Sequence, residues 1–325
     1  MKKVALGFKI PVLHRRDVIQ ARRTDAVLLL VALVWGSSYL AAKTATAALP
    51  VLVVLFARYL LSAVACLVLA TPGRRRGSWT RAEVRVGAVL GVTQAAVLVL
   101  ETFGVAHTSA ANAGLIISLT IVLTPLLDRS AGTGPLPPRF FAATAVCLLA
   151  VGLLMSGNGF HRPGTGDLLM LLAAVVRAAH VALVGRLTAR HPVRPMQLTA
   201  VQTVVGTALF ALPAAGGVPA LAQAPAAAWA QLGYLALFCS VFAFVAQTWA
   251  VQRTSASRAS LLLGTEPVWA VAVGICLGGE RFGVFAALGA VLMVTGTYWG
   301  QAVERAHRAT AHRRTPSRAT APAGT

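Results

Sequence analysis

Ten runs of mostly apolar residues follow one another along the 325 residues of this chain, and they constrain its fold more than any other feature. The hydrocarbon core of a bilayer is about 30 Å thick, so a helix needs roughly 20 apolar residues to cross it. Charged residues make up 12% of the chain, about half the share that is usual in soluble proteins. We therefore predict an all-α integral membrane protein with ten transmembrane helices. The expected spans are residues 26–44, 49–70, 84–102, 108–127, 139–157, 167–186, 196–214, 228–250, 258–278 and 282–300.

The distribution of basic residues predicts how these spans are oriented. If the N-terminus lies in the cytoplasm, 24 of the 29 Lys and Arg residues lie on the cytoplasmic side and only three lie outside. Such an excess is typical of cytoplasmic segments. We predict a multi-pass protein of the cell membrane whose tails, residues 1–25 and 301–325, are cytoplasmic, the second being disordered, with membrane lipids as partners. A nucleic-acid partner is not expected, because the net charge of +20 is spread over membrane-flanking segments.

The chain contains an internal repeat. The segment His107–Ala113 is similar to Arg253–Ala259, and each precedes a proline-containing helix, through Pro125 and Pro267 respectively. Because each half holds five spans, an odd number, the two halves must lie inverted in the membrane, as in many secondary transporters. This arrangement predicts alternating access to a site near the middle of the membrane. The expected repeats are residues 26–157 and 167–300.

Several segments together resemble the EamA-like family of the drug/metabolite transporter superfamily over about residues 26–300. These are Trp35-Gly36-Ser37-Ser38-Tyr39 with Lys43, Arg58, the segment from Thr108 to Pro125, and the segment from Glu266 to Arg281. The resemblance implies ten helices in two inverted repeats, no covalent cofactor, and usually the export of small metabolites or drugs. The transported substrate differs from member to member.

Motifs of common enzyme and metal sites are missing from the sequence. The four cysteines each lie inside an apolar run, without the spacing of a metal site or a disulfide framework. The sequence has no nucleophile elbow, no HExxH motif and no phosphate-binding GxxxxGK[ST] loop. We therefore expect no metal, no cofactor and no direct use of ATP, so that transport would be coupled to an ion gradient or be facilitative.

Glu266 is the leading candidate for a functional residue. It lies about eight residues into the ninth expected span and directly precedes Pro267, and a proline inside a helix breaks the hydrogen-bond ladder. We expect both Pro125 and Pro267 to break their helices. A carboxylate on an opened helix within the membrane is typical of a transport site, and protons are the candidate coupling ion. The alternative is a kink in which Glu266 has a structural role.

Two arginines are expected inside spans. Arg177 lies near the middle of the sixth span, with His180 on the same helix face. Glu266 is the expected counter-charge of Arg177. The pair would form either a helix-locking salt bridge or part of a substrate site. His180 is a candidate for the same site or a packing residue. Arg58 should bond backbone carbonyls or a neighbouring helix, or contact substrate. Two arginines against one glutamate would leave a positive cavity that favours a carboxylate-bearing solute such as an amino acid.

Further candidates line one face of the first span or lie at the centre of other spans. Trp35, Ser38 and Tyr39 share a helix face that forms either a substrate wall or a packing seam, and Gly36 should allow close helix approach. Uncharged hydrogen-bonding candidates are Gln94, Asn112 and Gln247. Three residues are expected at the outer ends of spans: Lys43, Glu101 and His107. They would either form an outer gate or simply lie at the membrane interface.

These observations predict a secondary exporter of a small metabolite or drug, working by alternating access as a monomer or a homodimer. An alternative is a membrane-embedded enzyme that acts on a lipid-linked substrate, with Glu266 and His180 as acid and base. A third possibility is a membrane sensor or scaffold that transports nothing.

Overall fold

The computed structural model describes residues 15–70, 79–108, 110–127, 136–156, 164–278 and 284–314, and every regular element in these ranges is helical. Within these described ranges, six helical segments are long and apolar enough to cross a membrane. They are Gln20–Ala48, Val51–Ala70, Arg81–His107, Thr165–Arg190, Pro195–Gln223 and Ala226–Val251. The protein is therefore an all-helical membrane protein with several apolar spans.

The helices follow the expected spans in order. In the first half they are α1 (Arg15–Ala48), α2 (Val51–Ala70), α3 (Arg81–His107), α4 (Ala110–Ile117), α5 (Thr120–Leu127) and α6 (Pro138–Ser156). In the second half they are α7 (Thr165–Arg190), α8 (Pro195–Ala214), η1 (Ala215–Gln223), α9 (Ala226–Ala236), η2 (Leu237–Phe242), α10 (Ala243–Val251), α11 (Ala256–Leu263), α12 (Glu266–Gly278) and α13 (Val284–Arg314).

Both terminal helices extend beyond the predicted spans. Helix α1 already begins at Arg15, and α13 continues to Arg314, so the prediction of a disordered tail from residue 301 is wrong for residues 301–314. The reason is composition, because this stretch is rich in Ala and Arg with Gln and Glu, which are good helix formers, and contains no Gly or Pro. The rest of the two predicted tails lies outside the described residues.

Two of the expected spans are each divided into two short helices at equivalent places. Helices α4 and α11 both have eight residues, and each is followed by a two-residue turn before the next helix begins. The turns are closed by matching backbone hydrogen bonds, in which Leu119 donates to Ile116 (3.1 Å) and Thr265 donates to Leu262 (3.2 Å). The second break, directly before Glu266, is where an opened helix was predicted.

The two prolines lie differently with respect to these breaks. Pro267 is the second residue of α12, where its missing N–H group costs no helical hydrogen bond. Pro125 lies inside α5, downstream of the turn at Ser118 and Leu119, so the prediction that Pro125 itself breaks the helix is wrong. A hydroxyl group bonds back to the chain at each turn instead, from Ser118 to the carbonyl of Gly114 and from Thr265 to that of Leu262. Such bonds compete with the regular helical ladder.

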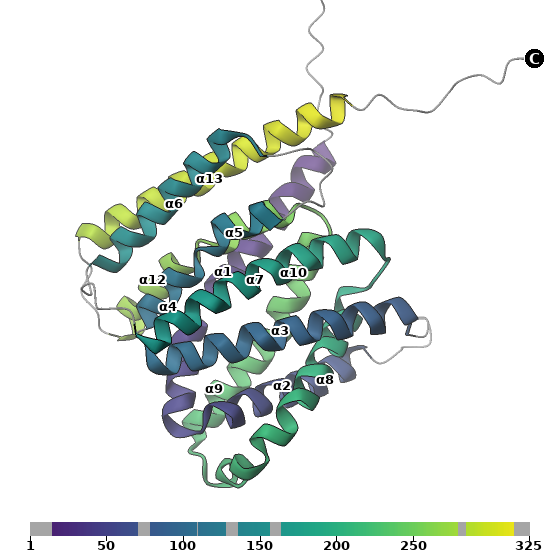
Figure 1. Ribbon diagram of the computed structural model, residues 1–325, viewed down its shortest axis with the longest axis vertical. Coiled ribbons are helices and arrows are strands. Elements are labelled where there is room, and N and C mark those ends of the chain that lie inside the picture. Colours follow the sequence, from purple (N-terminus) through teal and green to yellow (C-terminus); the bar gives the residue numbers. More distant parts are fainter. Residues whose placement is uncertain are drawn as a thin grey trace, which may run out of the picture.

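The first helix of each half packs into the other half. Helix α1 contacts α9, α10 and α12, while α7 contacts α3, α4 and α5. Figure 1 shows α6 and α13 side by side along one flank and α2 beside α8 at the opposite end, and both pairs are in contact. Side chains of α1 and α7 that point inward therefore meet residues of both halves.

The approach of α1 to α12 depends on Gly36. A Cβ atom at this position would lie 2.7 Å from the carbonyl oxygen of Glu266 and 2.8 Å from Cβ of Trp269. Only glycine avoids this overlap without moving a helix. The expectation that Gly36 allows close helix approach is confirmed, and the contact lies at the start of α12.

Candidate functional site

A small pocket lies between helices of the two halves. Eight of its lining residues were among the predicted site residues, and they come from α1, α2, α3, α7, α10 and α12: Trp35, Ser38, Arg58, Gln94, Arg177, His180, Gln247 and Glu266. The others are Val97, Leu98, Glu101 and Phe244. The cavity volume is about 30 Å³, which is enough for water but not for a metabolite. A solute can enter only if the lining helices move apart.

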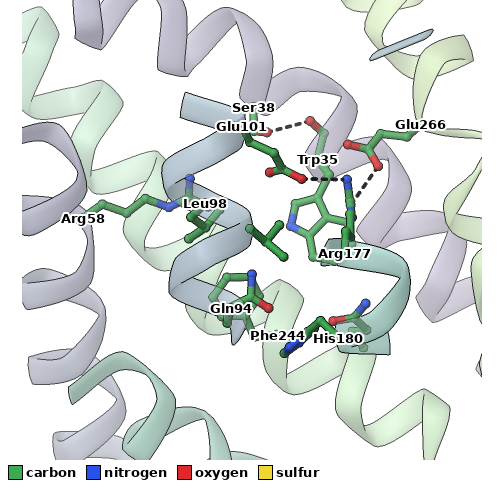
Figure 2. A pocket seen from close by; sticks show the side chains of 12 residues that line it. Trp35, Ser38, Arg58, Gln94, Leu98, Glu101, Arg177, His180, Phe244 and Glu266 are labelled. Atoms are coloured by element: carbon green, nitrogen blue, oxygen red, sulfur yellow. Dashed lines mark hydrogen bonds and ion pairs between the residues drawn. The ribbon is translucent and has the colours of Figure 1, made fainter. Parts of the chain in front are cut away.

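Arg177 is shared between two carboxylates at one side of the pocket. Its Nη2 donates to Oε2 of Glu266 (3.0 Å) and its Nη1 donates to Oε1 of Glu101 (3.2 Å), as Figure 2 shows. Arg177 is 7% exposed and Glu266 is 3% exposed. We name these three residues the carboxylate cluster. When all three groups are ionised, the cluster carries a net charge of −1 in a setting where charge is costly unless it is paired.

The aromatic residues predicted on one face of α1 contact this cluster. The guanidinium carbon of Arg177 lies 4.4 Å from the centroid of the Trp35 ring, within the range of a cation–π interaction. The hydroxyl group of Tyr39 donates to Oε1 of Glu266 (2.5 Å). Tyr39 therefore holds Glu266 without lining the pocket, and Trp35 forms one wall beside Arg177.

Glu101 is the residue whose surroundings were predicted wrongly. It was expected at an outer span end with Lys43 and His107, but it pairs with Arg177 instead. Nζ of Lys43 contacts the carbonyl of Thr108 (3.4 Å), and Nδ1 of His107 contacts that of Phe103 (2.8 Å). The cause is the length of α3, which continues to His107, so Glu101 lies about 9 Å before the helix end.

The charge of the pocket changes as a result. Two arginines, Arg58 and Arg177, face two glutamates, Glu101 and Glu266. The prediction of a net positive cavity is therefore wrong. The charges are instead divided, because both carboxylates pair with Arg177 and neither forms an ion pair with Arg58.

Arg58 bonds to the π-helical segment η2, as expected for a residue that bonds a neighbouring helix. Its Nε donates to Oγ of Ser240 (2.8 Å), and its Nη2 donates to the carbonyl of Cys239 (3.4 Å). The same carbonyl accepts a hydrogen bond from Nε1 of Trp35 (3.0 Å). A π-helical turn disturbs the regular pairing of backbone carbonyls, and here it presents acceptors to side chains from α1 and α2.

The remaining candidates differ in how they are bonded. Nδ1 of His180 lies 2.7 Å from Oγ1 of Thr93, and the hydroxyl group of Ser38 donates to the carbonyl of Trp35 (2.7 Å). Gln94 and Gln247 are buried and line the pocket. Asn112 belongs to α4, but its side chain is outside the described residues.

Comparison with known proteins identifies the family. The model of the EamA-like transporter family matches twice, over residues 22–156 and 164–299. The chain belongs to the EamA-like transporter family. It is therefore a membrane transporter and not an enzyme, which confirms the resemblance seen in the sequence and removes the membrane-embedded enzyme from consideration. The two matches indicate duplicated halves.

Individual relatives support the same assignment. An uncharacterized transporter of Archaeoglobus fulgidus is 26% identical over 279 residues, which cover 83% of this chain and 85% of the relative. A probable terminal-alkyne amino-acid exporter of Streptantibioticus cattleyicolor is 28% identical over 271 residues, which cover 83% and 90% of the two chains. One solved crystal structure has a TM-score of 0.68 to this EamA-like transporter at 20% identity, covering 86% of this chain and 98% of that chain. At this identity the likeness concerns the fold alone.

Proposed function

We propose that this EamA-like transporter is a secondary exporter of a small, amino-acid-like metabolite, with protons as the coupling ion. The observation that carries the proposal is the carboxylate cluster, in which the buried Arg177 is shared by Glu101 of α3 and by Glu266 at the start of α12. A proton or a substrate ammonium group that binds there neutralises the excess negative charge. One relative is named a probable terminal-alkyne amino-acid exporter, which agrees with this class of solute.

The proposal includes ten spans in two inverted halves, residues 26–157 and 167–300, which work by alternating access. The matching breaks between α4 and α5 and between α11 and α12 support this arrangement. The reciprocal packing of α1 against α12 and of α7 against α5 supports it as well. Because one chain holds both halves, a monomer suffices, and a homodimer is equally compatible.

Counterflow in proteoliposomes tests whether the protein transports such a solute. Vesicles loaded with an unlabelled compound are diluted into buffer that contains a trace of the same compound in labelled form. The compounds tested one by one are the standard amino acids and a set of cationic and neutral drugs. We expect labelled neutral amino acids to accumulate transiently above the level in protein-free vesicles. Exchange of drugs alone would contradict the substrate class, and no exchange of any compound would contradict the proposed function.

The inverted arrangement also predicts that both tails are cytoplasmic. Gly216 lies in an expected outer loop, is exposed and has open space around its Cβ position, and Thr310 is exposed on the last turns of α13. In an otherwise cysteine-free variant, an impermeant thiol reagent added to intact cells should label Gly216→Cys only. Thr310→Cys should react only after the membrane is made permeable. Labelling of Thr310→Cys in intact cells would overturn the orientation.

A further inference from the structure

Arg58 is a buried cation that faces the pocket without a carboxylate partner. It is 6% exposed and lines the pocket, yet none of the ion pairs within 4.0 Å among the described residues includes it. Its two hydrogen bonds go to a hydroxyl group and a carbonyl oxygen, both uncharged. A guanidinium group has five N–H donors, so most of its donors are left for another acceptor. A buried charge of this kind is costly unless something pairs with it.

The surroundings of Arg58 hold its guanidinium group in place. Oγ of Ser240 donates its own proton to the carbonyl of Leu235 (3.0 Å), so its lone pairs are available to accept from Nε of Arg58. The hydroxyl group of Ser62, one turn further along α2, donates to the carbonyls of Arg58 (2.7 Å) and Ala236 (3.1 Å) and so ties α2 to α9. The guanidinium group is thus oriented from behind by neutral groups, and no carboxylate among the described residues pairs with it directly.

The pocket therefore has two poles. Arg58 enters from α2, whereas Arg177 enters from α7, and Figure 2 shows Glu101 and Trp35 drawn between them. One pole carries the charge of +1 of Arg58, and the other is the carboxylate cluster with its net charge of −1. A solute that bears one anionic and one cationic group fits this pair of poles without leaving a charge unpaired.

We propose that Arg58 is the anion subsite of the transport site and binds the carboxylate of a zwitterionic solute, whose ammonium group lies at the carboxylate cluster. This inference rests on the proposed function and adds the residue that discriminates between solutes. An arginine can grip a carboxylate with two parallel N–H donors. The structure shows the contracted pocket, so the subsite is completed when the helices separate and the solute replaces water.

Competition experiments separate this role from a purely structural one. Counterflow of the best-transported standard amino acid is measured against three competitors: the unlabelled amino acid, the amine formed by its decarboxylation, and the acid that lacks its amino group. In the wild type, the amino acid should compete far better than the amine. Arg58→Gln should weaken competition by the amino acid roughly 10- to 100-fold, as for the loss of a hydrogen bond to a charged group. It should change competition by the amine by less than about 3-fold, so that the two compounds become similar.

Two further variants keep the test decisive. Ser240→Ala removes the hydroxyl acceptor behind Arg58 but keeps the charge of Arg58. The protein should therefore still prefer the amino acid over the amine, with weaker affinity for the amino acid. This variant keeps the proposal testable if Arg58→Gln does not fold. Arg253→Gln removes an exposed positive charge away from the pocket and should match the wild type.

Equal competition by amine and amino acid in the wild type would overturn the inference, as would an unchanged preference in Arg58→Gln. If the only compounds exchanged lack a carboxylate group, the anion subsite is refuted, although the protein still transports a solute. If no compound is exchanged, the proposed function itself is refuted.

Discussion

Glu266→Gln should abolish transport against a concentration gradient and still permit exchange down a gradient, with weaker binding of the solute because the carboxylate cluster loses its net negative charge. Glutamine preserves the shape of the side chain and can still accept the hydrogen bond from Tyr39. It cannot alternate between charged and neutral forms, which a proton carrier must do as the site changes sides. Arg177 keeps Glu101 as a partner, so the variant should fold. The measurement is substrate flux in proteoliposomes with and without an imposed pH gradient.

Glu101→Gln is the matched control, because it makes the same chemical change on the other carboxylate that pairs with Arg177. It should lower the rate of transport and retain accumulation driven by the pH gradient. Glu101 is partly buried and accepts no hydrogen bond from Tyr39 among the described residues, whereas Glu266 is held by both Tyr39 and Arg177. A Glu266→Gln protein that still concentrates substrate as the wild type does would exclude Glu266 as the obligatory proton site.

Gly36→Leu should cause the largest loss of folded protein among the variants considered. Even the first added carbon would lie 2.7 Å from the backbone carbonyl of Glu266, so α1 or α12 must move. Overpacking a tight contact typically costs about 1–3 kcal/mol, and this contact involves backbone atoms that cannot rotate away. We expect lower yield and a lower melting temperature in detergent, with lost flux in the protein that remains.

Gly233→Leu provides the comparison for this variant. Gly233 also lies in a helix, α9, but apart from the adjacent backbone of its own helix no atom lies within 4 Å of its Cβ position. The two variants add the same side chain, so the difference between them reports the contact rather than the residue type. If Gly36→Leu matched Gly233→Leu in yield, melting temperature and flux, α1 would not pack on α12 as the structure shows.

The parts of the fold that could be predicted are those that depend on local pattern. Apolar runs of membrane length predict where helices lie, and the spacing of Trp35 and Tyr39 predicts that both share a face, which the structure directs toward Arg177 and Glu266. The pairing of Arg177 with Glu266 could be predicted because a buried charge requires a partner, and the structure confirms it.

The missed features depend on contacts that are distant in the sequence or on helix ends. Glu101 and Arg177 lie 76 residues apart, and the partnership was missed because α3 was expected to end near residue 102 and not at His107. The first helix break carries no proline signal, since it precedes Pro125 and is closed by backbone and hydroxyl groups. The π-helical turn that presents the carbonyl of Cys239 has no sequence marker of its own, although the unpaired arginine in α2 indicated that such an acceptor was needed.

Proton movement that accompanies substrate movement tests the central claim most directly. Proteoliposomes that enclose a pH-sensitive dye are loaded with the amino acid that shows the strongest counterflow and diluted into substrate-free buffer. If the transporter exchanges substrate for protons, efflux of the amino acid from wild-type vesicles should acidify the lumen, while Glu266→Gln vesicles should release the amino acid without acidification. Efflux from wild-type vesicles with no change in internal pH, or equal acidification in the Glu266→Gln vesicles, would contradict the account.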